Sequence, residues 1–264
     1  MSEEKCCCSK EPLGTIPIMR IIGKLDACFA KNDMDEAGRI LDYWEKEARA
    51  LNDNRGLCEI LSEQIGYFRK VGNKERGLAA VDSALALLSC MDTGDSVSDA
   101  TIYLNCATTM KAFGKAEEAM QYYQKAKDVF ERVLPNDDFR LAGLYNNYAT
   151  ALVDLKKFAQ AREFYDKAID ILTRKKVLGE LAVTYVNLAH LVCDEAELKG
   201  VACDDEIEKL LDKAWECLDD KDQERDGNYA FICSKCAPAF GYFGYFMQKD
   251  ELQKRADEIY SRNC

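Results

Sequence analysis

The sequence is poor in the residues that break helices and lacks long apolar runs. It contains 4 prolines and 1 histidine in 264 residues. Valine and isoleucine do not gather in alternating runs, so the sequence argues against a sheet and predicts an all-helical chain. No apolar run reaches the ~18 residues that a membrane-spanning helix needs, so no membrane contact is predicted. A phosphate-binding loop is also missing, because Gly23-Lys24 lacks the upstream glycine.

Positive charge is also in deficit. Lys plus Arg number 36 and Asp plus Glu number 47, so the net charge is 36 − 47 = −11. An acidic protein repels phosphate backbones, and we therefore predict no nucleic-acid partner. A partner segment with basic residues would be attracted instead. With 48% hydrophobic residues, the chain has ample material for a folded core.

Cysteine, by contrast, is abundant. The 13 cysteines could suggest disulfides, but the N-terminal stretch "MSEEKCCCSK" has no apolar core and so does not resemble a signal peptide. Most of the others, such as Cys106 and Cys217, fall inside apolar helical patterns, where cysteine acts as a small hydrophobe. The odd count and this placement predict a reducing cytoplasm. Cys6 to Cys8 lie in a tail without periodicity, which is expected to be flexible and reduced, although a soft metal, a lipid or an intermolecular disulfide stays open.

One stretch of the sequence recurs at a fixed interval. The segment from Tyr103, "YLNCATTMKAFGKAEEAMQYYQKAKDVF", matches the segment from Tyr145, "YNNYATALVDLKKFAQAREFYDKAIDIL", at an offset of 145 − 103 = 42. The opening appears again from Tyr185 as "YVNLAHLV". Apolar residues within each unit recur at i, i+3, i+4 and i+7, which predicts two amphipathic helices, A and B. Repeats of this period are typical of solenoids.

Short polar turns force the two helices of a unit to be antiparallel, as Lys156-Lys157 does in the unit at Tyr145. Ala149, Ala161 and Ala168 then fall where the helix backbones approach most closely, and neighbouring aromatic residues fill the remaining space. The recurring tyrosines lie on the same apolar stripe, so packing is their predicted role. The aromatic stretch "GYFGYFM", from Gly241 to Met247, is interpreted as a cap that closes the end of the stack.

These units resemble the tetratricopeptide repeat family, whose pattern is a large residue, Asn, Leu and a small residue on helix A, then Ala, an aromatic and Ala on helix B. The period of forty-two is similar to that of the kinesin light chain class. The resemblance implies an all-α, right-handed superhelical solenoid of antiparallel helix pairs. After a flexible tail, residues 1–15, it implies one repeat domain, 16–264. Its units lie near residues 18–50, 58–90, 100–132, 142–174, 182–219 and 228–263.

The face of helix A opposite the core is then available to a partner, on the concave wall of the solenoid. Its residues are spaced by about one helical turn. We predict a peptide-binding groove formed by Asn105, Asn147, Asn187, Thr108, Thr150, His190, Asp154, Asp194 and Lys70. A carboxamide offers both a donor and an acceptor, as a peptide unit does, so the three asparagines could hold the backbone of a bound segment. The resemblance implies the same role. The alternative is that they bond only water or a neighbouring helix.

The sequence gives less support to a metal site or a catalytic site. Cys233 and Cys236 form a CxxC, but no second CxxC or nearby histidine completes a zinc site and no strand precedes it, so packing is predicted. Cys193 lies three residues after His190, which leaves a Cys–His pair open on spacing, yet nothing signals a substrate pocket or an oxyanion site. No catalytic residue, metal or cofactor is therefore predicted.

The sequence favours a non-catalytic cytoplasmic module that binds a protein or peptide ligand in the concave groove. The alternatives are a stand-alone peptide-sensing regulatory domain, as in bacterial peptide receptors of this family, and a thiol- or metal-dependent enzyme. The oligomeric state is left open.

Overall fold

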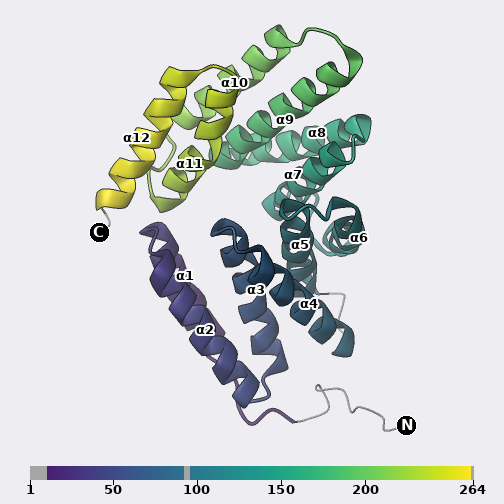
Figure 1. The fold of residues 1–264 in the computed structure, drawn as a ribbon, viewed down its shortest axis with the longest axis vertical. Coiled ribbons are helices and arrows are strands. Elements are labelled where there is room, and N and C mark those ends of the chain that lie inside the picture. The colour runs from purple at the N-terminus through teal and green to yellow at the C-terminus, as the bar shows by residue number, and fades with distance from the viewer. Residues whose placement is uncertain (1–10, 92–95, 263–264) are drawn as a thin grey trace. The chain divides into compact units, whose positions relative to one another are not determined.

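The computed structural model describes residues 11–91 and 96–262. Within these ranges the chain forms twelve α-helices and no strand, so the predicted all-α class is confirmed (Figure 1). Cys6 to Cys8 and most of the predicted tail lie outside the described residues. The helices are α1 (Ile18–Ala30), α2 (Met34–Ala50), α3 (Asn54–Lys70), α4 (Lys74–Cys90), α5 (Val97–Ala112), α6 (Ala116–Val133), α7 (Phe139–Asp154), α8 (Phe158–Lys175), α9 (Leu178–Lys199), α10 (Asp204–Asp219), α11 (Gly227–Tyr242) and α12 (Phe246–Arg262). No helix in the described ranges is both long and apolar enough to cross a membrane.

The helices pair as antiparallel hairpins. From α3 onward, each odd-numbered helix, called an A helix, packs most extensively against the even-numbered B helix that follows it. Only three residues separate α5 from α6 and α7 from α8, because Gly114 and Lys156 turn the chain with positive φ values of 85° and 57°. The predicted solenoid of antiparallel helix pairs is therefore the observed architecture.

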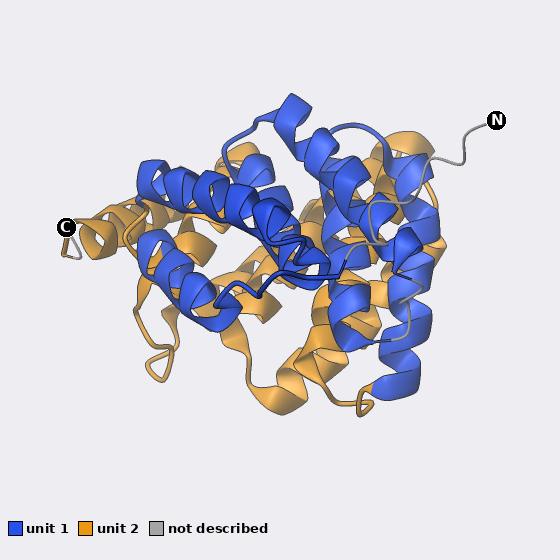
Figure 2. Ribbon diagram, turned by 90° about the horizontal axis from the view of Figure 1, so that it is seen from below, with its two compact units in different colours: residues 1–29, 33–133 blue, residues 30–32, 134–264 orange. Residues whose placement is uncertain are grey.

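The chain divides into two compact units, which are coloured separately in Figure 2. Unit 1 comprises residues 1–29 and 33–133, and unit 2 comprises residues 30–32 and 134–264. Inside unit 1, α3 contacts α2, α4 and α5. Inside unit 2, α9 contacts α7, α8, α10 and α11. Within each unit, neighbouring A helices therefore touch and present adjacent faces.

Local capping explains where many of the helices begin. Asp53 accepts a hydrogen bond from the backbone N–H of Gly56 at 2.9 Å and thereby caps α3. The same buried carboxylate accepts the N–H of Ile16 at 2.8 Å, which ties the segment before α1 to α3. Asn73, Ser96 and Asp226 cap α4, α5 and α11 in the same way. Each cap satisfies a donor that the first helical turn would otherwise leave without a partner.

The turn between α7 and α8 contains a lysine where other hairpins have glycine. Lys156 has φ 57°, whereas Gly114 and Gly244 hold the corresponding places with φ 85° and 86°. A left-handed conformation costs a residue with a Cβ roughly 1–2 kcal/mol, and part of this is offset because glycine gains more entropy in the unfolded chain. We expect Lys156→Gly to raise the free energy of unfolding by about 0.5–1 kcal/mol, measured by urea denaturation. Lys157→Gly, one residue later at φ −91°, is the matched control and should not raise the free energy of unfolding. Equal effects of the two changes would contradict the presence of backbone strain at Lys156.

The alanines of the repeat lie where the sequence predicted the closest helix contacts. Ala149, Ala161 and Ala168 are fully buried, at 0% exposure. The Phe164 ring fills the adjacent space, with its centre 4.7 Å from that of Tyr148. At Gly77, which replaces the first B-helix alanine in its unit, an added Cβ would lie 2.8 Å from the ring of Phe113. Small residues are therefore needed at these positions because neighbouring aromatic rings already occupy the volume.

The recurring tyrosines also belong to the packed interior. Tyr103 and Tyr145 are buried and Tyr185 is half-buried, which confirms the predicted packing role. A lysine of each partner B helix lies over the ring. The distances from Nζ to the ring centre are 5.3 Å for Lys125 and Tyr103, 5.5 Å for Lys167 and Tyr145, and 5.5 Å for Lys213 and Tyr185. These cation–π contacts repeat from hairpin to hairpin and shield the edge of the core.

Candidate ligand-binding face

All nine residues predicted for the groove lie on A helices. In unit 1, α3 carries Lys70 and α5 carries Asn105 and Thr108. In unit 2, α7 carries Asn147, Thr150 and Asp154, and α9 carries Asn187, His190 and Asp194. Lys70 and the two aspartates are exposed and the others are half-buried, so all nine border the surface. Because α7 contacts α9, the structure brings six of these residues onto two adjoining helix faces in unit 2.

The side-chain amides of the asparagines make specific contacts. Nδ2 of Asn105 donates to Oγ of Ser62 on α3 at 2.9 Å, and Nδ2 of Asn187 donates to Oδ1 of Asn146 on α7 at 3.0 Å. Nδ2 of Asn147 donates to the carbonyl of Gly143 in its own helix at 2.9 Å. Two of the three asparagines thus bond a neighbouring A helix, as the alternative interpretation expected. Each bond uses one N–H of an amide that has two N–H groups and a carbonyl, so the bonds orient the amides and leave further hydrogen-bonding capacity.

The hydroxyls and the imidazole beside the asparagines are also oriented. Thr108 donates to the carbonyl of Leu104 at 2.8 Å, and Thr150 donates to the carbonyl of Asn147 at 2.7 Å. The ring of His190 lies 4.9 Å from that of Phe243. Burial lowers the pKa of His190, against the opposing effect of Asp194, so the imidazole is neutral at pH 7 and can both donate and accept a hydrogen bond.

The face continues onto α11, which the sequence interpretation missed. Phe243 closes α11 as Leu155 closes α7, an offset of 243 − 155 = 88. By this register α11 presents Phe231, Lys235, Pro238 and Tyr242 at the places of Gly143, Asn147, Thr150 and Asp154 in α7. All four are exposed. We call the residues at these four places on α7, α9 and α11 the A-helix face of unit 2.

The interpretation of residues 241–247 as a terminal cap is wrong. These residues end α11, form the turn and start α12 at Phe246. The signal that could have shown this is the pair Phe243-Gly244, which repeats Phe113-Gly114 of an earlier turn. Gly244 and Gly114 have matching positive φ values of 86° and 85°. Aligning the turns would have placed α11 in register.

Three helical glycines leave open space beside them: Gly23 on α1, and Gly66 and Gly143 on the A helices α3 and α7. A Cβ added to Gly23, Gly66 or Gly143 would meet nothing within 4 Å outside its own helix. By contrast, a Cβ at Gly38 would lie 2.6 Å from the hydroxyl of Tyr67. Glycine inside a helix costs roughly 0.5–1 kcal/mol relative to alanine. At the three open positions this cost has no packing reason, and the backbone there is accessible to a ligand.

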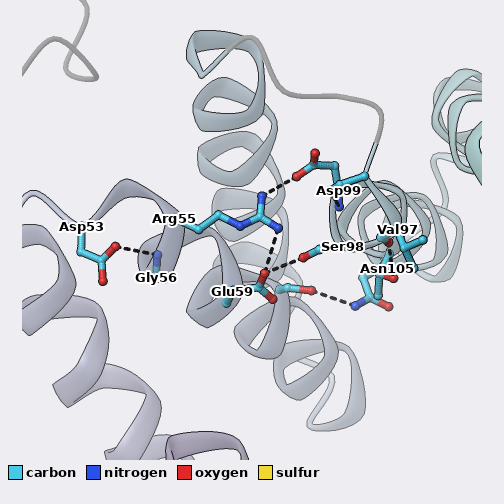
Figure 3. Close-up of polar contacts among 11 residues, drawn as sticks. Asp53, Arg55, Gly56, Glu59, Val97, Ser98, Asp99 and Asn105 are labelled. Atoms are coloured by element: carbon cyan, nitrogen blue, oxygen red, sulfur yellow. Dashed lines mark hydrogen bonds and ion pairs between the residues drawn. The ribbon is translucent and has the colours of Figure 1, made fainter. Parts of the chain in front are cut away.

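In unit 1, a polar network joins the first turns of α3 and α5. Figure 3 shows Arg55 between Glu59 of its own helix and Asp99 of α5. Arg55 Nη1 lies 2.5 Å from the buried Asp99 carboxylate, and Nη2 lies 3.1 Å from Glu59. Ser98 donates to the same oxygen of Glu59 at 2.5 Å. This network fixes the two A helices side by side and places carboxylates along their faces.

Glu63 occupies the place on α3 that Asn147 has on α7. Burial raises the pKa of Glu63 to about 6, and the carboxylates of Asp26 and Glu59 add to the effect. Ionising Glu63 therefore costs more free energy in the folded protein than in the unfolded chain. A cation placed against this face would relieve the repulsion, so unit 1 is suited to a basic group.

We expect Glu63→Gln to stabilise the protein at pH 7.5 but not at pH 4. Because the folded-state pKa lies above the unfolded value, the acidic form contributes stability below the unfolded pKa, and this is lost as the pH rises through about 6. The expected gain at pH 7.5 is about 2 kcal/mol at most, since each pKa unit corresponds to about 1.4 kcal/mol. Urea denaturation at both pH values measures it. An equal gain in stability at pH 4 would show that the raised pKa of Glu63 is not its cause.

The thiols near this face do not have the character of nucleophiles. Burial raises the pKa of Cys193, and a side-chain hydrogen bond with Tyr242 offsets only part of this effect. Cys233 and Cys236 are buried, and burial raises the pKa of Cys236 to about 12. A nucleophilic cysteine needs a lowered pKa. The packing role predicted for the CxxC therefore fits their surroundings.

A pocket of about 500 Å³ lies elsewhere in unit 2. The turn before α9 and the connection between α10 and α11 form it, with Lys176, Glu180 and Asp222 among its lining residues. None of the nine predicted residues lines this pocket. The pocket and the A-helix face are therefore formed by different residues.

Comparisons with known proteins agree with the geometry. Two family models, both described as tetratricopeptide repeat, match residues 142–171 and 100–139. No curated protein sequence matches the chain significantly. Among solved structures, repeats of a kinesin light chain from Podosopora anserina are 14% identical with a TM-score of 0.51, and the match covers 76% of this chain and 94% of that one. The family models thus confirm the predicted tetratricopeptide repeats over these residues, and the kinesin light chain repeats share the fold.

Two further solved structures contain ligands. A Rap protein complexed with Competence and Sporulation Factor is 14% identical with a TM-score of 0.62, and the match covers 95% of this chain and 66% of that one. PlcR of Bacillus thuringiensis, solved with the peptide PapR7 and DNA, is 14% identical with a TM-score of 0.57, and the match covers 76% and 69% of the two chains. At these identities the similarity establishes the fold.

Proposed function

We propose that this tetratricopeptide-repeat protein is a non-catalytic binding module that takes a peptide or a segment of a partner protein along its A-helix faces. The observation that carries the proposal is a row of oriented amides and hydroxyls beside open glycine positions. Asn147 and Thr150 lie one and two turns from Gly143, where no side chain fills the space. Such a surface can hydrogen-bond a peptide backbone that approaches closely. The similarity to PlcR, solved with PapR7, supports a peptide as the ligand.

Charge favours a basic partner. The net charge is −11, and Glu63 is held close to two further carboxylates in unit 1. The same charge argues against nucleic acid as a ligand, although PlcR was solved with DNA as well as peptide. We propose a reducing, cytoplasmic setting because five cysteines are buried in the helical core as thiols and not as disulfides: Cys58, Cys106, Cys217, Cys233 and Cys236.

A comparison of three proteins in a pull-down from native lysate tests the proposal. The first is wild type, and the second carries Asn105→Ala, Asn147→Ala and Asn187→Ala. The third carries Gln121→Ala, Gln160→Ala and Gln253→Ala, which remove exposed carboxamides from B helices. We expect partners to be lost in the asparagine variant and kept in the glutamine variant.

Thermal melting of each variant separates binding from folding, because Asn105 and Asn187 also bond neighbouring helices. If the asparagine variant melts as a folded protein and keeps every wild-type partner, the proposal fails. Equal loss from both triple variants would also count against it, because B-helix positions would then matter as much as the A-helix face.

A second candidate function is a stand-alone peptide sensor. The similarity to Rap complexed with Competence and Sporulation Factor, together with the division into two compact units, favours it. A sensor changes the arrangement of its parts when the ligand binds, whereas a simple adaptor does not. X-ray scattering of the protein with and without a bound peptide distinguishes the two. An unchanged radius of gyration would reject the sensor.

A further inference from the structure

The last hairpin of unit 2 exposes large apolar side chains. Tyr242 at the end of α11 is 64% exposed, and Phe246 and Met247 at the start of α12 are 62% and 84% exposed. We call these three residues the apolar patch. The three flank a single turn, and exposed apolar side chains that lie together on a surface mark interaction sites.

The places of Met247 and Tyr242 are small or polar in other hairpins, whereas the place of Phe246 is also apolar in α2 and α8, which begin with Met34 and Phe158. The place of Met247, second in the B helix, is held by Asp35, Glu75, Glu117 and Ala159 in α2, α4, α6 and α8. The place of Tyr242 is held by Lys70, Ala112 and Asp154 in α3, α5 and α7. Tyr242 and Met247 therefore depart from the repeat pattern and are not a requirement of the hairpin.

The apolar patch adjoins acidic residues of α9. The ring centres of His190 and Tyr242 are 5.3 Å apart, so the faces of α9 and α11 are continuous here. Cys193, Glu197 and Asp194 all raise the pKa of the Tyr242 phenol, which places these side chains close to it. Asp194 and Glu197 are exposed, as is Asp154 at the corresponding place on α7.

On the exposed face of α11, positive charge lies farther away, while Lys249 of α12 packs against Gly241 and pairs with Asp250. Lys235 is exposed on α11, seven residues before Tyr242, which corresponds to about 10 Å along the helix. The face therefore has a basic position near the middle of α11 and an acidic, apolar end at the turn. This arrangement of charges determines the direction in which a ligand binds along the face.

We propose that unit 2 binds a peptide segment with a basic side chain held by Asp154 and Asp194 and a bulky apolar side chain that covers Tyr242, Phe246 and Met247. The inference rests on the proposed function and specifies its partner. The ammonium or guanidinium group pairs with the carboxylates and can also lie over the exposed ring of Tyr242. The apolar side chain removes the patch from water. Charge complementarity selects this occupant over a second copy of the chain, which is itself acidic.

Selection of random dodecapeptides by phage display on the full chain tests the inference. Wild type should enrich peptides that combine Lys or Arg with a large apolar residue. An Asp154→Asn, Asp194→Asn variant should lose the basic preference and keep the apolar one. A Tyr242→Ser, Met247→Gln variant should show the reverse. All four positions are exposed, so the fold should survive, and circular dichroism checks this.

The outcomes separate the inference from the proposed function. If wild type enriches peptides without the basic and apolar preference, or if neither variant changes it, the inference is overturned while peptide binding stands. If wild type enriches no peptide, both fail. Light scattering tests whether a second copy of the chain occupies the patch instead. If wild type is a dimer and the Tyr242→Ser, Met247→Gln variant is a monomer, the patch is a dimer interface and the inference is overturned.

Discussion

Gly143→Leu is expected to lower the affinity of unit 2 for its peptide about 100-fold, which corresponds to about 2.7 kcal/mol. The α7 backbone is open at Gly143, where an added Cβ would meet no atom within 4 Å. A leucine there can adopt an ordinary helical rotamer and project into the space that the ligand is proposed to occupy. The same change should raise the free energy of unfolding by about 0.5–1 kcal/mol, because leucine favours a helix more than glycine does. Fluorescence anisotropy of a labelled peptide selected by wild type measures the affinity.

The opposite signs of the two effects make this variant informative. Most substitutions that abolish binding also destabilise the fold, whereas here binding should fall while stability rises. Ala159→Leu is the matched control, since Ala159 is exposed on the B helix of the same hairpin. It should leave the affinity unchanged. An unaltered affinity for Gly143→Leu would show that the ligand does not approach α7 at this position.

Ala161→Leu is expected to lower the free energy of unfolding by about 3 kcal/mol, near the upper end of the usual cost of overpacking. Ala161 has no exposed surface. The rings of Tyr145 and Phe164 lie 5.6 Å apart in the same hairpin, so no unfilled volume is available for three more carbons. The two helices must separate to admit the larger side chain. Urea denaturation followed by circular dichroism gives the change.

Ala159→Leu again supplies the control, because it adds the same atoms two residues away on the exposed side of α8. Its effect should stay within about 0.5 kcal/mol, as for most surface substitutions. Similar losses of unfolding free energy from both variants would mean that helix propensity, and not packing, determines the effect of leucine in α8. In that case the buried alanine would not mark the closest approach of the two helices.

The repeat made the fold predictable from the sequence. Tyr103 and Tyr145 fix the period, and Ala149 and Ala161 mark the two helices that pack together. Each helix buries only one face, so the spacing of apolar residues and alanines carries the information. Polar turns such as Lys156-Lys157 then fix the antiparallel pairing, which the structure confirms.

The candidate site was less predictable, because its properties depend on contacts between helices. The spacing places Asn105 and Asn187 on the outer face of helix A, but it cannot show that their amides reach Ser62 and Asn146 on neighbouring helices. It also cannot show that Glu63 is desolvated enough to raise its pKa to about 6. Packing across the hairpins determines both features.

The predicted groove included no residue of the last hairpin, although the predicted unit 228–263 contains both of its helices. The run of aromatic residues around Phe243 hides the turn, since large apolar residues usually mark a core and not an exposed loop. Gly244 with its positive φ of 86° is the residue that identifies the turn. Once α11 is in register, Tyr242 joins the A-helix face and the apolar patch becomes visible.

The central claim is that the ligand lies on the A-helix faces and not on the B helices. Photo-cross-linking tests it most directly, with a benzophenone amino acid placed at the exposed position 235 on α11 or, as the comparison, at position 163 on the exposed side of α8. With a labelled peptide selected by wild type, position 235 should yield a cross-linked product and position 163 should not. Cross-linking from position 163 alone would contradict the claim.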